Sequence, residues 1–328
     1  MDTDSYIWSI FAKMIFMNFF KILFISVASL CLCTCGNKDS KKQQTITLGV
    51  MSSMDYLPLA VAQREGDFAK HGIDIRLQKF LSANERDAAL QSGVVDGTVT
   101  DYTSAALVKA GGFDLKIASK CQAPFLIMAG KESGVENLEG LKGKKIAVSQ
   151  NTVIDFCVDM ALASAGLTES DVEKVEINKI PLRMEMMRNN KIDATGLPDP
   201  LGLIAGSEGC KTLATMDEVG YTVTGIVFTQ KAIDNKSAEI RKMYAAYNDG
   251  VAYLRAHSIE DIKDILVKEM GFPEALVMQA KTPVYTDAQA PTDSDKDVVA
   301  VVEWLSRKGL IAKDFNISDL IDPSLTNQ

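Results

Sequence analysis

The chain has 328 residues, of which 47% are hydrophobic and 24% are charged, and its formal net charge is −8. This composition is typical of a globular protein with substantial cores, and the length allows about two domains. Because the net charge is negative and the sequence contains no basic patch, nucleic acid and anionic membrane surfaces are disfavoured as partners.

The first residues have the order of an export signal. From Met17, the single basic residue Lys21 is followed by apolar or small residues over 22–32, and then by a cysteine cluster and a polar stretch. Secretory signals are built in this order. The acidic residues before Met17 do not suit a signal start, so Met17 is the more natural initiator. We expect a signal peptide over 1–34.

The segment LCTCG at 32–36 resembles the end of a bacterial lipoprotein signal, in which the cut precedes a cysteine that is then lipidated. The resemblance implies lipidation of Cys35, with 35–44 as a tether that holds an exported protein at the periplasmic face or cell surface. Thr34 is a less usual residue before the cut than Gly, Ala or Ser. The alternative is an uncleaved membrane anchor, which the short apolar run disfavours because a span needs about 20 residues.

Three cysteines follow the signal: Cys121, Cys157 and Cys210. They have no Cys-x-x-Cys or Cys/His spacing, which disfavours zinc and iron-sulfur sites. We expect each to be a small buried residue, and a disulfide between two of them stays open. We expect no metal ion and no cofactor.

Strand-like and helix-like stretches alternate from Thr45 onward. ITLGV at 46–50 is a short apolar run typical of a buried strand, and a helix-like run ends at Gly66. Residues 72–80 alternate apolar and polar side chains, as half-buried strands do. A helix, a strand, a helix and a strand follow. This alternation predicts a parallel sheet covered by helices.

The same order begins again at LEGLKGKKIAVSQNT, and one phrase recurs in both units. A short β-prone stretch opens with an aspartate, Asp96 or Asp193, and ends in a second aspartate, Asp101 or Asp199, that starts a helix-like run. We therefore expect two similar lobes. The first comprises 45–127 and 221–328, with helices at its C-terminal end, and the second comprises 128–220.

Three segments carry a resemblance to a known family: GVMSSMDYLPLAVAQREGDFAKHGIDIRLQKF, ALQSGVVDGTVTD and LEGLKGKKIAVSQNT. The chain from about 45 to 310 resembles the solute-binding lipoproteins of ABC importers, in the nitrate, sulfonate, taurine and thiamine-pyrimidine group called NMT1/THI5-like. The resemblance implies a type 2 periplasmic-binding-protein fold, with two parallel-sheet α/β lobes joined by two hinge strands. It also implies a monomer that closes on a small molecule and then docks on a permease driven by an ATPase.

Candidate ligand-binding residues follow from this geometry, because open parallel sheets bind ligands where their strands end and helices begin. The candidates are Ser52, Ser53, Asp55, Tyr56, Thr100, Asp101, Tyr102, Ser149, Asn151, Thr152, Arg183, Pro198 and Asp199. The two tyrosines would offer flat surfaces to a ring. Some polar candidates have an alternative role. Arg183 suits a solvated surface charge, and helix caps are suited by Asp101, Asp199, Ser149, Asn151 and Thr152.

We do not expect an enzyme. His71 and His257 each lie at the end of a helix-like run, and no nucleophile elbow, phosphate loop or metal motif is present in the sequence. One alternative is a pyrimidine-synthase-like enzyme of the same fold, but such enzymes use a cysteine-rich motif that this chain lacks after Cys35. A receptor's sensing domain is a third class, and it would need a membrane span after the polar ending DPSLTNQ.

The acidic candidates bear on the ligand. Asp55, Asp101, Asp155 and Asp199 are all expected near the cleft rim, and uncompensated carboxylates repel an anion. The sequence therefore favours a neutral or amine-bearing ligand, such as a pyrimidine precursor of thiamine, over a sulfonate or nitrate. Taurine and simple sulfonates stay open as alternatives.

Overall fold

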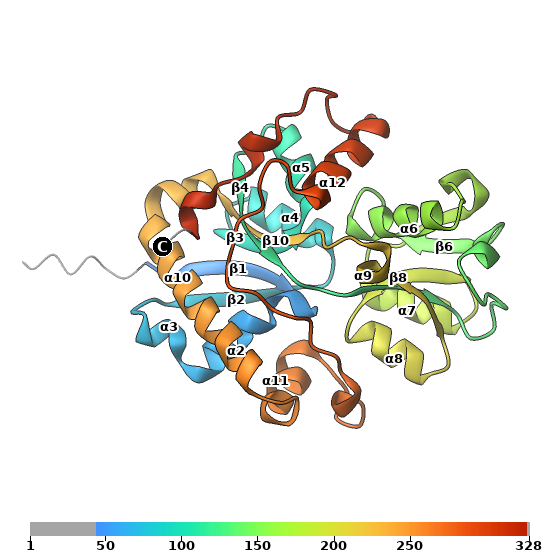
Figure 1. Cartoon of the computed structure of the whole chain (residues 1–328), viewed down its shortest axis with the longest axis horizontal. Helices are drawn as coiled ribbons and strands as arrows, with labels where there is room; N and C mark the ends of the chain where they lie inside the picture. The colour runs from blue at the N-terminus through green and yellow to red at the C-terminus, as the bar shows by residue number, and fades with distance from the viewer. Residues whose placement is uncertain (1–43, 327–328) are drawn as a thin grey trace, which may run out of the picture. The chain divides into compact units, whose positions relative to one another are not determined.

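The structure is a computed structural model that describes residues 44–326. The expected signal peptide, the lipidation of Cys35 and nearly all of the expected tether lie outside these residues. From Gln44 onward the chain forms one compact unit (Figure 1). Within the described residues, no helix is both long enough and apolar enough to cross a membrane.

The first of two five-stranded sheets has the order β2-β1-β3-β10-β4. Its strands are β1 (Ile46–Met51), β2 (Ile75–Phe80), β3 (Gly97–Asp101), β4 (Leu115–Cys121) and β10 (Thr224–Thr229). β1 pairs in parallel with both β2 and β3, whereas β10 is antiparallel to β3 and β4. We call the part of the chain built on this sheet the first lobe.

The second sheet repeats the arrangement with the order β7-β6-β8-β5-β9. Its strands are β5 (Phe125–Ala129), β6 (Lys145–Val148), β7 (Glu173–Glu176), β8 (Ala194–Pro198) and β9 (Lys211–Thr215). β6 pairs in parallel with β7 and β8, and β5 is antiparallel to β8 and β9. We call the part built on this sheet the second lobe.

Each sheet is mixed: four of its five strands run parallel to one another, as expected, and one is antiparallel. The antiparallel member is in each case the strand that enters from the other lobe: β5 follows β4 of the first sheet, and β10 follows β9 and α9 of the second. A strand that arrives by crossing enters from the opposite end of the sheet, which reverses its direction. Since β5 begins at Phe125, the expected boundary between 127 and 128 falls inside this strand.

Helices cover both sheets (Figure 1). The first lobe carries α2 (Leu57–Glu65), α3 (Asp67–Lys70), α4 (Ala83–Gln91), α5 (Tyr102–Ala110), α10 (Gln230–Ala256), α11 (Lys263–Ile265) and α12 (Lys296–Arg307). The second lobe carries α6 (Val153–Ser164), α7 (Ile180–Arg188), α8 (Leu201–Ser207) and α9 (Met216–Val219). Short helices are η1 (Met54–Tyr56), η2 (Glu139–Leu141), η3 (Glu169–Asp171), η4 (Glu260–Ile262), η5 (Leu266–Met270), η6 (Val277–Gln279), η7 (Ile317–Leu320) and η8 (Pro323–Leu325).

The recurring aspartates have matching roles in the two lobes. Asp96 Oδ2 accepts the backbone N–H of Thr47 in β1 at 2.8 Å, and Asp193 Oδ2 accepts that of Lys145 in β6 at 2.8 Å. The later members both accept a backbone N–H from the first turn of a helix: Asp101, the N-cap of α5, accepts that of Ser104 at 2.8 Å, and Asp199, one residue before the N-cap of α8, accepts that of Leu203 at 3.1 Å. The first aspartate of each phrase therefore joins two strands, and the second satisfies a helix N-terminus.

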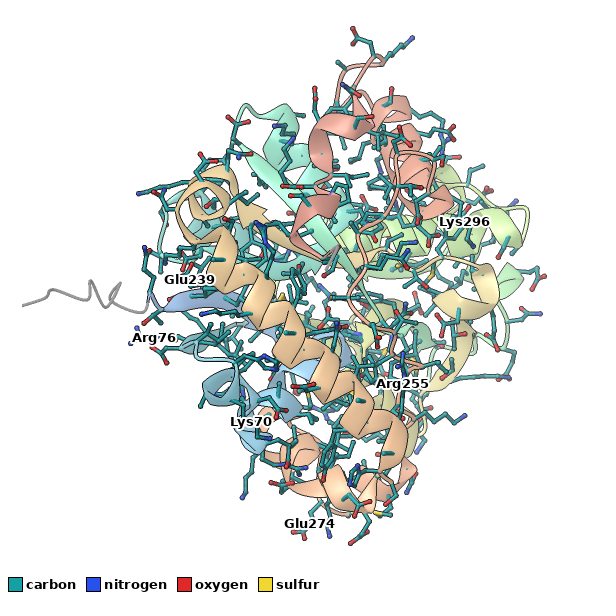
Figure 2. All side chains as sticks on the ribbon, turned by 60° about the vertical axis from the view of Figure 1, so that its left-hand side comes forward. Lys70, Arg76, Glu239, Arg255, Glu274 and Lys296 are labelled. Atoms are coloured by element: carbon teal, nitrogen blue, oxygen red, sulfur yellow. The ribbon has the colours of Figure 1, made fainter. Side chains whose placement is uncertain are left out.

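Two features show how closely the helices pack. α10 crosses α2 at Gly250, where a Cβ atom would lie 2.2 Å from the carbonyl oxygen of Pro58. Near the crossing strands, the Phe156 ring of α6 makes edge contacts with Tyr221 and with Trp304 of α12, at centroid distances of 5.4 and 5.6 Å. Charged side chains such as Lys70, Arg76 and Arg255 are exposed instead (Figure 2).

The three cysteines of the described residues are free thiols. Cys121 and Cys157 are buried, as expected for small core residues, and Cys210 is partly exposed. Burial raises the pKa of the Cys121 and Cys157 thiols well above the ordinary value. Neither thiol is therefore suited to act as a nucleophile.

Candidate functional site

A cavity lies between the lobes, where the carboxyl ends of strands from both sheets meet. The space that water-sized molecules can occupy in it is about 50 Å³, several times what one buried water needs. Its lining residues are Met51, Ser52, Ser53, Asp55, Ala83, Arg86, Val99, Thr100, Asp101, Phe125, Ser149, Thr152, Val153, Ile154, Asn178, Ile180, Arg183, Pro198 and Thr224. Because both lobes contribute, a ligand held here would contact both at once.

Most of the candidates named from the sequence reach this cavity. They come from the ends of β1, β3, β6 and β8 and from α7, as the strand-end rule predicts. The candidates in the lining are Ser52, Ser53, Asp55, Thr100, Asp101, Ser149, Thr152, Arg183 and Pro198.

Four other candidates are not part of the lining. Tyr56 is buried in the first lobe and donates a hydrogen bond from its hydroxyl to the Glu269 carbonyl at 2.8 Å. Tyr102 is also fully buried, so neither tyrosine offers a face to a ring. Asn151 donates its backbone N–H to a carboxylate behind the loop, and Asp199 Oδ1 accepts the Leu203 N–H at 3.1 Å.

Arg86, a buried residue of α4, lines the cavity but was not predicted from the sequence. Its Nε donates to Asp87 Oδ1 at 2.9 Å, and its Nη2 lies 3.3 Å from Asp101 Oδ2 and 3.1 Å from Ser104 Oγ. Two carboxylates therefore balance this guanidinium. In the sequence it lies within an ordinary charged helix, so only its position in space identifies it.

Arg183 has no comparable partners, although its side chain is fully buried. Nη1 donates to the carbonyl of Ile177 at 2.9 Å, while Nε and Nη2 have no hydrogen-bond partner among the described residues. Burial alone lowers the pKa of the guanidinium to about 10, so the group remains charged at neutral pH. A buried cation without an ion-pair partner is costly, and this one lines the cavity between the lobes.

Asp55 is the second unusual charge in the cavity. Burial raises the pKa of its carboxyl to about 7, and Arg86 opposes that rise. Asp55 Oδ1 has no hydrogen-bond partner within residues 44–326, nor do the neighbouring hydroxyls of Ser53 and Thr100. The first lobe thus offers a carboxyl and two hydroxyls opposite the guanidinium of the second lobe.

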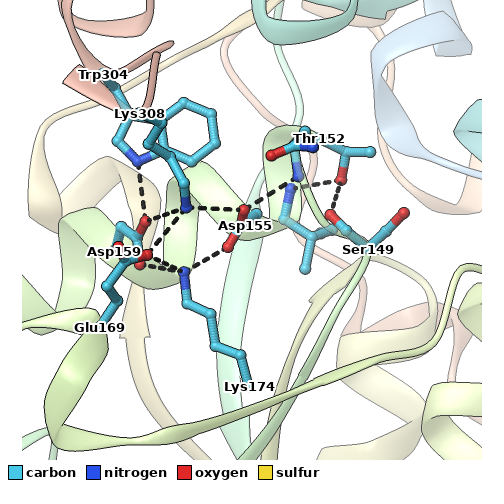
Figure 3. Close-up of polar contacts among 10 residues, drawn as sticks. Ser149, Thr152, Asp155, Asp159, Glu169, Lys174, Trp304 and Lys308 are labelled. Atoms are coloured by element: carbon cyan, nitrogen blue, oxygen red, sulfur yellow. Dashed lines mark hydrogen bonds and ion pairs between the residues drawn. The ribbon is translucent and has the colours of Figure 1, made fainter. Parts of the chain in front are cut away.

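The acidic rim expected from the sequence is smaller in the structure. Asp155 is ion-paired with Lys174 and Lys308 at 2.5 and 3.3 Å, behind the cavity (Figure 3). Asp101 is balanced by Arg86, and Asp199 is used as a cap. Of these four carboxylates, only Asp55 lines the cavity without an ion pair, so the premise that four carboxylates repel an anion is wrong.

Two lobes joined by crossing strands, with a cavity at their strand ends, define the class of two-lobed solute-binding folds. The family model described as NMT1/THI5 like matches residues 53–261. The chain therefore belongs to the NMT1/THI5-like family, which confirms the expectation from its motifs.

Individual relatives agree with this family. A Bacillus subtilis (strain 168) protein, provisionally named an aliphatic sulfonates-binding protein, is 26% identical over 69% of this chain and 72% of its own length. The alkanesulfonate-binding protein SsuA from Xanthomonas axonopodis pv. citri, bound to MOPS, has a TM-score of 0.72. It is 19% identical, over 85% of this chain and 98% of its own. The periplasmic-binding-protein fold is thereby confirmed.

The same fold also occurs in an enzyme. The desulfurization enzyme DSZB superposes with a TM-score of 0.64 at 13% identity, over 87% of this chain and 98% of its own. Fold similarity by itself therefore does not separate binding from catalysis. The relatives named as binding proteins favour binding.

Proposed function

We propose that this chain is the solute-binding component of an ABC importer and that its ligand carries an anionic group bound by Arg183. The observation that carries the proposal is the burial of this guanidinium in the cavity between the lobes, with two nitrogens lacking partners. An oxyanion such as a sulfonate accepts bidentate hydrogen bonds from a guanidinium. The names of the sulfonate-binding relatives support this class of ligand.

The ligand also carries a hydrogen-bond donor that meets Asp55. A simple alkyl acid would leave Asp55 Oδ1 buried without a partner, at a cost of about 1–3 kcal/mol. An amino or hydroxyl group on the ligand would satisfy it. The proposed ligand therefore keeps the amine that the sequence favoured. It differs from the neutral molecule expected there because it also carries an acidic group.

The remaining parts of the proposal rest on the signal-like segment over 17–36 and on the resemblance to binding proteins of ABC importers. The protein is exported, is held outside the cytoplasm by a lipid on Cys35, and acts as a monomer. A ligand that contacts both lobes shifts the population toward the closed form, and this form delivers it to permease and ATPase subunits. Changing Cys35 to Ser would then release the protein from the membrane fraction.

Calorimetric binding to four probes tests the ligand class: ethanesulfonate, 2-aminoethanesulfonate, 2-hydroxyethanesulfonate and nitrate. We expect the two substituted sulfonates to bind best, by roughly tenfold or more over ethanesulfonate. Preference for ethanesulfonate or nitrate would reject the role of Asp55. If a neutral aminopyrimidine bound while all four anions failed, the anion assignment itself would be rejected.

A matched pair of variants tests the role of Arg183. Arg183→Met removes the buried cation, and Arg188→Met removes a cation from the same helix that is bound to Glu208 at the surface. We expect the first change to abolish sulfonate binding and the second to leave it intact. Equal binding by both variants would show that the anion binds elsewhere.

A further inference from the structure

The C-terminal helix of the first lobe reaches across to the second. α12 packs against α5, and its N-cap Asp295 is ion-paired with Lys120 of β4, which anchors the helix to the first sheet. Lys308 follows directly after its last turn. The position of Lys308 is therefore set by the first lobe.

The partners of Lys308 belong to the second lobe. Its Nζ lies 3.3 Å from Asp155 Oδ2, 3.4 Å from Asp159 Oδ2 and 3.0 Å from Glu169 Oε2. Figure 3 shows these carboxylates converging on the ammonium group. In the same helix, Trp304 Nε1 donates to Asp159 Oδ2 at 2.9 Å. α12 is thus joined to α6 and η3 by several polar contacts.

One of these carboxylates is also bonded to a loop of the candidate site. Asp155 Oδ2 accepts the backbone N–H of Asn151 at 3.0 Å, and Thr152 Oγ1 donates to the Ser149 carbonyl at 2.7 Å. Ser149 and Thr152 line the cavity. Asn151 has a φ of 61°, a left-handed conformation that costs a non-glycine residue free energy and needs support from its surroundings.

The network is partly shielded from water, which distinguishes it from an ordinary surface ion pair. The side chains of Asp155, Lys174 and Lys308 are 2%, 12% and 22% exposed. Charged hydrogen bonds in such a place are stronger and less screened than those between exposed groups. Lys174, which comes from the second lobe, helps to hold Asp155 but cannot link the lobes.

We propose that Lys308 is a positioning residue for ligand binding. From the first lobe it holds Asp155, and Asp155 in turn holds the cavity loop 149–152 of the second lobe. The effect of Lys308 on ligand affinity rests on the proposed function, whereas its effect on the order of the loop does not. Lys308 thereby couples the ordering of the cavity loop to the relative position of the two lobes, on the side of the cavity where α12 lies.

The first test needs no ligand. Amide hydrogen exchange is measured on the full chain as wild type, Lys308→Met, Lys308→Arg and Lys109→Met. Lys109 is the matched control, since its side chain is 18% exposed and its ion pair with Asp114 lies within the first lobe. We expect Lys308→Met alone to speed exchange across 149–156 by about fivefold or more, while the later turns of α6 over 160–164 keep their protection.

The outcomes separate positioning from general stability. Unchanged exchange across 149–156 in Lys308→Met, or an equal rise in Lys109→Met, would overturn the proposal. A rise throughout α6 would also overturn it, because the effect would then be loss of helix stability. Should Lys308→Met fail to fold, Glu169→Gln removes one exposed arm of the network. For Glu169→Gln we expect a smaller rise in exchange across 149–156, and the absence of this rise would overturn the proposal.

The second test uses 2-aminoethanesulfonate as the probe. Lys308→Met should weaken its binding roughly three- to tenfold, with Lys308→Arg near wild type and Lys109→Met unchanged. Normal binding by Lys308→Met would reject the link to affinity. If wild type does not bind the probe, the proposed ligand class fails, and the exchange result alone decides the role of Lys308.

Discussion

Arg183 combines full burial with a charge that no described carboxylate balances. Such a group lowers the stability of the ligand-free protein, because the free-energy cost of desolvating a charge is offset only when a partner is present. Binding sites often accept this cost for the sake of function.

We therefore predict that Arg183→Met raises the melting temperature of the ligand-free protein while it abolishes ligand binding. The gain in the free energy of unfolding should be on the order of 2 kcal/mol, since an unpaired buried polar group is removed. Urea denaturation with and without sulfonate provides the measurement. A less stable Arg183→Met variant would mean that the guanidinium contributes to packing or has a partner in solution.

Asp55 gives a prediction in the pH dependence of stability. Its folded pKa is about 7, against an ordinary value of 3.8. Between these values the folded state holds a proton that the unfolded state has lost, so the free energy of unfolding falls as the pH rises. Asp55→Asn removes this loss, and we expect it to be about 1–3 kcal/mol more stable than wild type at pH 8.

The difference should shrink as the pH falls toward 4, where the carboxyl is protonated in the folded state and close to half protonated in the unfolded state. Denaturation curves at several pH values between 4 and 8 measure this trend. A constant difference between Asp55→Asn and wild type across the range would show that the carboxyl titrates normally.

At the scale of elements, the contact between α2 and α10 depends on a glycine. A Cβ atom at position 250 would lie 2.2 Å from a backbone oxygen of Pro58, and backbone cannot turn aside as a side chain can. Gly250→Ala should therefore push the helices apart and cost about 1–3 kcal/mol of stability. Gly206→Ala in α8 is the control, because nothing lies near its added methyl.

The comparison of these two glycines is made by thermal unfolding. Alanine normally favours helix over glycine by about 1 kcal/mol, so the control should gain stability or stay level. If Gly250→Ala behaves like the control, the two helices are not in close contact in solution.

At the scale of the whole molecule, a further ion pair between the lobes lies near the cavity, apart from the Lys308 network. Lys179 Nζ lies 3.5 Å from Glu85 Oε1, and their side chains are 57% and 44% exposed. Exposed ion pairs contribute little to the free energy of unfolding. An ion pair between the lobes, however, stabilises the closed form and so affects ligand affinity. Glu85→Lys should weaken binding of 2-aminoethanesulfonate about two- to fivefold at low salt.

Charge exchange provides the decisive comparison. The double variant Glu85→Lys with Lys179→Glu restores opposite charges and should recover most of the affinity at low salt. Independent, additive losses in the double variant would show that these side chains do not meet in the ligand-bound protein.

Local patterns in the sequence predicted many of the elements. The apolar run ITLGV became β1, the alternating stretch at 72–80 contains β2, and Gly66 ends α2 with a φ of 75°. The recurring aspartates marked equivalent places in two similar lobes. These predictions succeeded because periodicity and turn chemistry act over a few neighbouring residues.

The direction of β5 and β10 could not be read in this way. Their side-chain patterns would suit a parallel or an antiparallel neighbour, and only the crossing of the chain between the sheets decides which one they pair with. The same limit applies to Tyr56 and Tyr102, which lie next to cavity-lining residues in the chain but are buried in the core. A side chain one position away from a lining residue can point in another direction.

The sequence by itself therefore determined the two α/β units, the family and the strand ends that meet at the cavity, since these depend on local pattern and on motifs. Only the tertiary structure decided which charged side chains are paired and which are buried without an ion pair. It paired Arg86 with Asp101, placed Asp155 in a network with Lys308, and placed Arg183 and Asp55 in one cavity without an ion pair. The physical reason is that the energy of a charge depends on its burial and on neighbours that are distant in the chain, and neither is encoded in the spacing of residues along it.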